Sequence, residues 1–270
     1  MSRSSRILVV AGGASGLGKE IVLLAAQKGY RVAILDTHEA RAKQLCSHLA
    51  DEKQEHFFVR CDIRSEQDCR RAIGRIVQRW GHIDVLFQAA GIATSGLVET
   101  VTQEQWRQQL DVNMLGTVNL NQAVLREMKQ QKAGHIVNVA GLVGLMPTPS
   151  MSSYAATNAA IIAYSESLYS ELAPLGIYVS VVCPHFFKSH LNENLYTTDP
   201  LARARFERLL NRTNISTEEV ARRTFVQMEK KTFMILPHPN SRALWRHKRW
   251  FPKRFYRSLI NLAEKVRPTP

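Results

Sequence analysis

The chain has 270 residues, 45% of them hydrophobic, which suits one α/β domain with a full core. Its four cysteines form no CxxC pair, and residues 1–6 are too short and polar for a signal peptide, so we expect a cytoplasmic protein and not a secreted one. No apolar run is long enough to cross a bilayer, which argues against a membrane-spanning protein. The formal net charge is +13, but nine Lys or Arg and the single acid Glu264 fall in residues 241–270, so nucleic-acid binding is a question about this tail alone, and we do not expect it.

The first predicted elements are a strand, a glycine-rich turn and a helix. Residues 7–11 form an apolar run typical of a strand buried on both faces. Gly12, Gly13, Gly16 and Gly18 follow, and apolar residues then recur with helical spacing. Glycines also serve ordinary tight turns. A strand that breaks on glycines and restarts as a helix, however, presents backbone N–H groups to a phosphate, and this predicts a pyrophosphate site.

The next strand, residues 31–35, ends at Asp36, about twenty residues beyond the glycine turn. A carboxylate there accepts both ribose hydroxyls and repels a 2′-phosphate. No basic residue stands at Ser15 or Thr37 to receive that phosphate. The unit is therefore predicted to bind NAD in preference to NADP.

Strands and helices alternate through the rest of the chain. Strands are predicted at residues 56–61, 83–87, 135–139, 177–182 and 233–236. Helices are predicted at residues 39–49, 65–80 and 102–128, around Tyr154 and Asn158, and from residue 216. Residues 185–214 are expected to form a polar, irregular lid. The alternation predicts a Rossmann-type, doubly wound parallel sheet in a single domain, residues 1–240, with a basic helical extension, residues 241–270.

These motifs, in this order, resemble those of the classical short-chain dehydrogenase/reductase family over about 240 residues. The family's TGxxxGxG loop reads AGGASGLG at residues 11–18, and Asn113, Tyr154 and Pro184 match further motifs. The resemblance implies catalytic roles for Asn113 and Tyr154, with no metal. It implies that the cofactor is held by Gly12, Ser15, Gly16, Leu17, Gly18, Asp36, Asp62, Ile63, Ala90, Gly91, Asn113, Tyr154, Pro184 and Ser189.

Three motifs depart from the family in ways that concern the chemistry. Its NNAG motif reads QAAG at residues 88–91, its catalytic serine is Gly141, and its YxxxK lysine is Asn158. Without the lysine's positive charge, we expect Tyr154 to stay near a pKa of about 10, so that it donates a proton well but accepts one poorly. Asn158 is either an ordinary polar helix residue or a substitute that reaches the ribose. A serine hydroxyl in the loop before the helix is one possible replacement for the lost serine, with candidates at Ser150, Ser152 and Ser153.

Three functions remain open at this point. The first is NAD-dependent carbonyl reduction or alcohol oxidation through Tyr154 and Asn113, with reduction the less impaired direction. The second is a non-redox cyclase, isomerase or lyase that reuses Tyr154 as an acid, and the third is a catalytically silent nucleotide-binding subunit. The resemblance implies a homodimer or homotetramer. His185 either lines the pocket or lies on the surface. A small-molecule substrate that is apolar or of acyl type is expected, and Phe186, Phe187, Leu191 and Leu195 indicate its apolar character.

The tail interleaves basic and aromatic residues between Arg242 and Arg257, and Pro252 is predicted to divide it into two short helices. Such a segment is compatible with peripheral contact to an anionic membrane, with an acyl-CoA or carrier-protein substrate, or with a subunit boundary. It is equally compatible with an ordinary helix that packs its aromatic residues in the core and exposes its charges.

Overall fold

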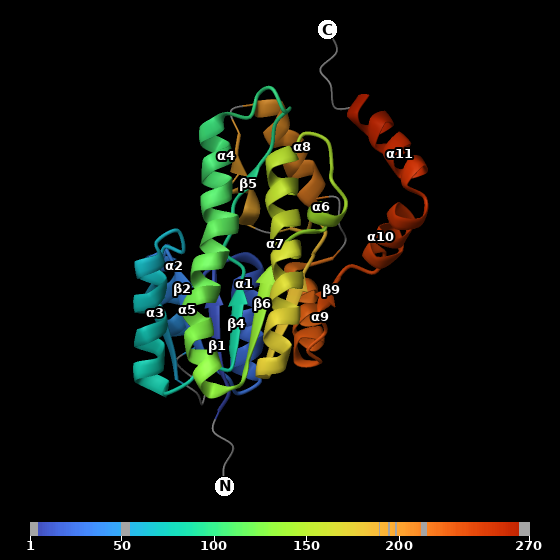
Figure 1. The fold of residues 1–270 in the computed structure, drawn as a ribbon. Helices are drawn as coiled ribbons and strands as arrows, with labels where there is room; N and C mark the ends of the chain where they lie inside the picture. Colours follow the sequence, from blue (N-terminus) through green and yellow to red (C-terminus); the bar gives the residue numbers. More distant parts are fainter. Residues whose placement is uncertain are drawn as a thin grey trace.

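The computed structural model describes residues 5–49, 55–188, 190–193, 195–197, 199–211 and 215–264. A parallel sheet with strand order β3-β2-β1-β4-β6-β7-β9 forms its centre (Figure 1). The strands are β1 (Ile7–Ala11), β2 (Arg31–Asp36), β3 (His56–Arg60), β4 (Val85–Gln88), β6 (Gly134–Val139), β7 (Ile177–Val182) and β9 (Met234–Ile235). The order reverses between β1 and β4, and ligands of doubly wound sheets bind at such a reversal, outside the carboxyl ends of the strands. The predicted fold class is confirmed.

Helices cover both faces of the sheet, because the central strands are apolar on both sides. Leu8 and Val10 of β1 pack with α1 (Gly16–Gln27), α2 (Glu39–His48) and α9 (Thr217–Glu229). Ile7 and Val9 point the other way. Their face is covered by α3 (Glu66–Trp80), α5 (Gly116–Gln131) and α7 (Ser152–Leu172). The 3₁₀ turn Ala173–Leu175 follows α7.

The helix predicted over residues 102–128 is not continuous. It begins at Thr102 with the expected capping box to Gln105, but α4 (Gln103–Gln109) passes into a π-helical segment, Leu110–Leu115, before α5. Thr117 supplies one reason, because its hydroxyl donates to the Asn113 carbonyl at 2.7 Å. Such π-helical turns are often found at functional sites.

The expectation of an irregular lid over residues 185–214 is wrong for much of that stretch. It contains the 3₁₀ turn His190–Asn192, β8 (Leu195–Tyr196), which pairs with β5 (Ala93–Thr94), and α8 (Pro200–Asn211). Buried Ala202, Phe206 and Leu210 recur at four-residue spacing in α8, a helical pattern that the intervening arginines obscure. A short helix, α6 (Leu142–Leu145), also occupies the loop predicted after β6.

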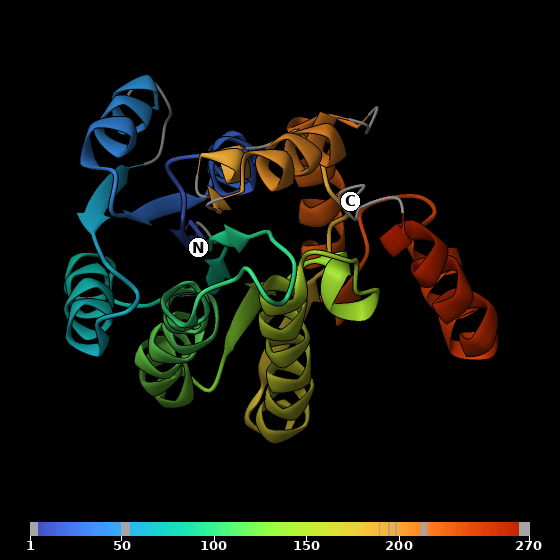
Figure 2. The ribbon, with the colours of Figure 1, turned by 90° about the horizontal axis from the view of Figure 1, so that it is seen from above.

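The tail forms α10 (Ser241–Trp250) and α11 (Pro252–Glu264), divided at Pro252 as predicted. Figures 1 and 2 show both helices, in red, at one side of the molecule. Within the described ranges, no helix combines the length and the apolar character needed to cross a bilayer.

Candidate active site

Two adjoining cavities lie at the carboxyl edge of the sheet. The first, here called the long cleft, has a volume of about 380 Å³ and runs from the glycine turn past Asp36 and Asp62 to Tyr154. The second, the apolar pocket, has a volume of about 210 Å³ and lies between the loop after β6 and α11. Tyr154 and Pro184 line both cavities. Every predicted cofactor-binding residue that the structure describes lines the long cleft. Ser189 lies outside the described residues.

Bare backbone forms one end of the long cleft. Gly12 has a φ of +70°, and a Cβ there would lie only 2.7 Å from the backbone N of Ala90. A Cβ on Gly18 would collide with the carbonyl oxygen of Gly12. Ser15 precedes α1, and its side chain makes no capping hydrogen bond. Glycines are therefore required here, and the N-terminus of α1 is left open to a phosphate.

Asp36 stands at the end of β2 with both carboxylate oxygens held by backbone. Oδ2 accepts from the N–H of Ala14 at 3.0 Å, and Oδ1 accepts from the N–H of His38 at 2.9 Å. The carboxylate therefore has a fixed position on the wall of the cleft, where its remaining lone pairs suit two hydroxyl donors.

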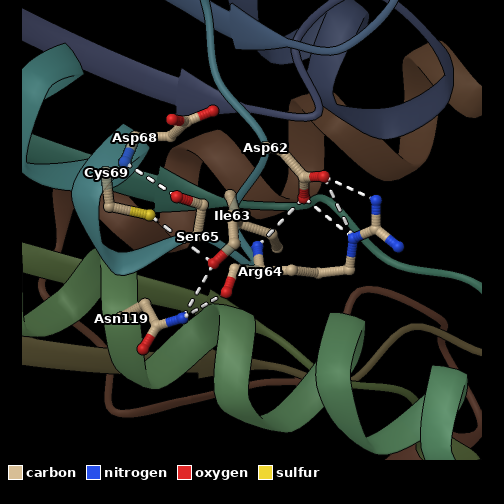
Figure 3. Close-up of polar contacts among 7 residues, drawn as sticks. All are labelled: Asp62, Ile63, Arg64, Ser65, Asp68, Cys69 and Asn119. Carbon is tan, nitrogen blue, oxygen red and sulfur yellow. Dashed lines mark hydrogen bonds and ion pairs between the residues drawn. The ribbon is translucent and has the colours of Figure 1, made fainter.

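Asp62, one of the predicted cofactor-binding residues, is engaged by Arg64 (Figure 3). The Arg64 side chain donates to Oδ1 through Nε at 3.0 Å and to Oδ2 through Nη2 at 2.6 Å, and it holds the pKa of the Asp62 carboxyl below its ordinary value. Asn119 of α5 fixes the loop by donating to the carbonyls of Ile63 and Arg64 at 3.0 and 3.2 Å. Arg64 itself lines the long cleft, and sequence reasoning missed it, although its position two residues after Asp62 was a visible signal.

Asn113, in the π-helical segment, is 5% exposed and binds backbone with both ends of its amide. Its Nδ2 donates to the Ile92 carbonyl and its Oδ1 accepts from the Ile92 N–H, each at 2.9 Å. Gln109 also donates to the Ile92 carbonyl at 2.9 Å. Asn113 thus holds the segment after β4 against the π-helical turn beside the long cleft.

Tyr154 and Asn158 lie one turn apart on α7, where the two cavities meet. Nδ2 of the buried Asn158 donates to the Tyr154 backbone carbonyl at 2.7 Å. Gly141 faces this amide, because a Cβ there would lie 3.2 Å from Asn158 Oδ1. Burial raises the pKa of the Tyr154 phenol to about 12, above the expected value of about 10, although Asn158 lowers it in part. The phenol is therefore neutral at physiological pH.

The apolar pocket carries few polar side chains. Tyr154, Thr148 and His185 line it, whereas Ser150, Ser152 and Ser153 are absent from its lining among the described residues and have buried hydroxyls without a hydrogen-bond partner. The three serines are thus not in place to replace the missing one. Apolar residues that line the pocket include Phe186, Phe187 and Leu191, as expected, and Phe255, Leu259 and Leu262 of α11; Leu195 packs in β8 instead.

His185 lines the pocket and is not an ordinary surface residue. The ring Nδ1 of His185 accepts from the backbone N–H of Phe186 at 2.8 Å. The backbone N–H of His185 donates to Nδ1 of His238 at 3.2 Å. Burial lowers the pKa of the His185 imidazole. A neutral ring whose Nδ1 accepts a hydrogen bond carries its proton on Nε2. The sequence left a place in the pocket open for His185, but it did not predict an Nε2 proton there.

Residues 6–200 match the family model described as short chain dehydrogenase. The chain belongs to the short-chain dehydrogenase family. Members of this family are NAD(P)-dependent oxidoreductases. The match ends before α9, α10 and α11.

Relatives of known name agree with this assignment. The 3-oxoacyl-[acyl-carrier-protein] reductases of human and mouse are 32% and 34% identical to this chain over 190 residues. These residues cover 70% of this chain and 79% of each reductase. The 3-oxoacyl-[acyl-carrier-protein] reductase FabG of Staphylococcus aureus strain N315 is 29% identical over 210 residues, 74% of this chain and 85% of its own.

Solved structures show the same fold. A short-chain dehydrogenase/reductase from Burkholderia phymatum, in complex with NAD, superposes with a TM-score of 0.87 at 23% identity and covers 94% of this chain and 96% of its own. A short-chain dehydrogenase from Streptomyces avermitilis gives 0.83 at 22% identity, over 99% of this chain and 100% of its own.

Proposed function

We propose that this short-chain dehydrogenase uses NAD(H) to reduce the carbonyl group of an apolar, acyl-type substrate, with Tyr154 as the proton donor. The observation that carries the proposal is that Tyr154, a neutral phenol, lines both the long cleft and the apolar pocket. Relatives named as 3-oxoacyl reductases support an acyl-type ketone as the substrate class.

The residues of the long cleft fit a dinucleotide. The glycine turn and the open N-terminus of α1 suit its phosphates, and the Asp36 carboxylate suits an unphosphorylated ribose. A 2′-phosphate would meet the fixed negative charge of Asp36, which favours NAD over NADP. When bound, a nicotinamide nucleotide supplies a hydride to the carbonyl carbon.

The state of Tyr154 favours the reductive direction. With its pKa at about 12, the phenol keeps its proton over the whole neutral range and is available to protonate the substrate oxygen. The phenolate required for alcohol oxidation is present in only about one molecule in 10⁵ at pH 7. The missing lysine therefore impairs oxidation much more than reduction.

The carbonyl oxygen needs a second donor, because Gly141 has no hydroxyl. The His185 Nε2–H and the Thr148 hydroxyl are the side-chain donors that line the apolar pocket besides Tyr154. We assign the orientation of the substrate oxygen to His185, since its tautomer is set by the Phe186 N–H. Asn113 and Asn158 act as positioning residues, through Ile92 and the Tyr154 carbonyl.

The test begins with calorimetric titration of NADH and NADPH into wild-type protein and Asp36→Ala. We expect NADH to bind at least about tenfold more tightly than NADPH, and this preference to disappear in the variant. NADH consumption is then followed with medium-chain ketones and 3-oxoacyl thioesters.

Three outcomes would contradict the proposal. If the protein binds neither NADH nor NADPH, the proposal has no basis. If the protein binds a nucleotide but turns over no ketone, and activity appears only in Gly141→Ser/Asn158→Lys, the protein is a catalytically silent nucleotide-binding subunit. Turnover that needs no nucleotide assigns a non-redox enzyme.

A further inference from the structure

The two C-terminal helices present different faces to the protein and to solvent. On the inner side, Phe255, Leu259 and Leu262 of α11 line the apolar pocket, and Lys248 of α10 donates to the Leu145 carbonyl. These contacts hold the pair of helices against the body of the molecule. The inner face therefore accounts for Phe255, Leu259 and Leu262. It does not account for the apolar residues of the tail that face solvent, here called the outer set: Leu244, Trp250, Phe251, Tyr256 and Ile260.

The outer set is apolar and exposed. Trp250 is 73% exposed and Ile260 is 60% exposed, and Leu244, Phe251 and Tyr256 are exposed as well. An ordinary C-terminal helix buries its aromatic residues and exposes its charges, but here only Phe255 among the aromatic residues of α11 is buried. Exposed apolar side chains gathered on one short segment mark an interaction site.

Positive charges surround these apolar side chains. Arg242, Arg246, Arg249, Lys253, Arg254 and Arg257 are all exposed, and no acidic side chain among the described residues pairs with them. Arg254 lies over the Phe251 ring with its guanidinium 5.6 Å from the ring centroid, so charge and apolar surface are interleaved. Glu264 is the one acid in residues 241–264. The partner of this surface is therefore anionic and also accepts apolar side chains.

We propose that the outer faces of α10 and α11 dock on an anionic lipid bilayer, and that the substrate enters the apolar pocket from that bilayer past Leu259 and Leu262. Helices that rest in a bilayer interface combine Lys and Arg with Trp, Phe and Leu, which is the pattern of Arg249, Trp250, Phe251 and Lys253. An acidic protein matches the charges but offers no apolar phase for Trp250 and Ile260. The substrate is then a membrane-dissolved molecule with a long apolar chain and a carbonyl group.

The docking step stands on its own, whereas the entry of substrate rests on the proposed reductase function. Docking is tested by sedimentation of the full chain with vesicles of phosphatidylcholine alone and with added phosphatidylglycerol. We expect binding to the phosphatidylglycerol vesicles only, and loss of that binding in high salt.

Two sets of variants locate the contact. Arg249→Glu/Lys253→Glu/Arg257→Glu is expected to weaken vesicle binding at least about 100-fold, and Trp250→Ser/Ile260→Ser about tenfold or more. The matched control, Lys28→Glu/Arg75→Glu/Arg126→Glu, reverses three exposed charges elsewhere and is expected to leave more of the binding in place. Calorimetric binding of NADH by each variant reports whether the fold is retained.

Several results would overturn the proposal. They are failure to bind phosphatidylglycerol vesicles, equal binding by wild type and the tail triple variant, and an equal loss in tail and control variants. Binding of an acidic acyl carrier protein through the tail residues, without vesicle binding, would assign the surface to a protein partner.

Entry from the bilayer is tested separately with a long-chain ketone dissolved in the vesicles and a short ketone in solution. Phosphatidylglycerol is expected to stimulate turnover of the long ketone about tenfold or more in wild type and not in the tail triple variant, with the short ketone unaffected. Vesicle binding without nucleotide-dependent turnover would contradict the proposed reductase function and leave the docking proposal intact.

Discussion

At the residue scale, Gly141 and Asn158, where the resemblance predicts a serine and a lysine, face each other. Gly141 has an extended backbone that any residue adopts, with φ at −146°, but a Cβ there lies 3.2 Å from Asn158 Oδ1. A serine at 141 therefore displaces the asparagine slightly, and the two substitutions are coupled. A lysine at 158, four residues after Tyr154, returns a positive charge to the tyrosine's side of α7.

We predict that Gly141→Ser/Asn158→Lys raises alcohol oxidation at pH 7 by about 100-fold or more. A positive charge 4 to 5 Å from the phenol is worth roughly 3 to 4 kcal/mol at an effective dielectric of about 20, or two to three pK units. Reduction is expected to change much less, because it uses the neutral phenol. Equal gains in both directions, measured as kcat, would contradict this explanation.

The pH dependence of the wild-type enzyme follows from the Tyr154 pKa. Burial raises that pKa to about 12, so the proton donor for reduction is lost only as pH rises toward 12. Reduction should be flat between about pH 6 and 10, while oxidation should rise about tenfold per pH unit. A reduction rate that falls with a midpoint near pH 7 would identify a different acid.

His185→Phe removes the Nε2 donor and keeps an aromatic ring in the pocket. We predict a loss of about 10- to 100-fold in kcat/KM for reduction, carried mainly by kcat, because the hydrogen bond strengthens as charge develops on the oxygen. Thr148→Val provides the comparison. A larger loss in that variant would transfer the orienting role to Thr148.

The candidate site was predictable wherever it depends on strand ends. In a doubly wound parallel sheet, residues that directly follow strands meet at one edge, so Gly12, Asp36 and Asp62 come together in one cleft. Thr148 and Arg64 were missed, and His185 was left open between the pocket and the surface, because their place in the site depends on loop packing and on a tautomer that no spacing encodes.

At the element scale, the break between α4 and α5 shows where a helical pattern is insufficient. The sequence predicted one helix over residues 102–128, starting at Thr102 with Gln105, yet buried hydrogen bonds at its centre favour a π-helical turn. Thr117 is 1% exposed. Its hydroxyl accepts a hydrogen bond from Nε2 of Gln88 at 3.1 Å and donates one to the Asn113 carbonyl at 2.7 Å. Gln88 lies 29 residues away from Thr117 in sequence, so the local helical pattern carries no sign of that hydrogen bond.

Thr117→Val tests this account, because it keeps the shape and removes the hydroxyl. We predict a loss of about 1 to 3 kcal/mol in the free energy of unfolding, since the Asn113 carbonyl loses its donor, together with weaker NADH binding. The matched control is Thr224→Val, whose buried hydroxyl has no hydrogen-bond partner among the residues that the structure describes, so its removal should be neutral or stabilising. Equal changes in the free energy of unfolding for the two variants, measured by denaturant unfolding, would contradict this explanation.

At the scale of the whole molecule, the topology was predictable because apolar runs and helical spacing alternate throughout, and a parallel sheet is the simplest arrangement that buries both faces. The position of the tail was not predictable. Its sequence allowed a core helix, a lipid surface or a subunit boundary, and only the structure shows Phe255 and Leu259 against the apolar pocket with Trp250 in solvent. The tail thus forms one wall of the candidate substrate site.

The central claim is that Tyr154 donates a proton between the nucleotide cleft and the apolar pocket. Its most direct test is single-turnover oxidation of NADH by wild-type protein and Tyr154→Phe, each saturated with NADH and given the same apolar ketone at pH 7. We predict that the variant still binds NADH and loses about 10³-fold in rate. Equal rates in the two proteins would contradict the claim.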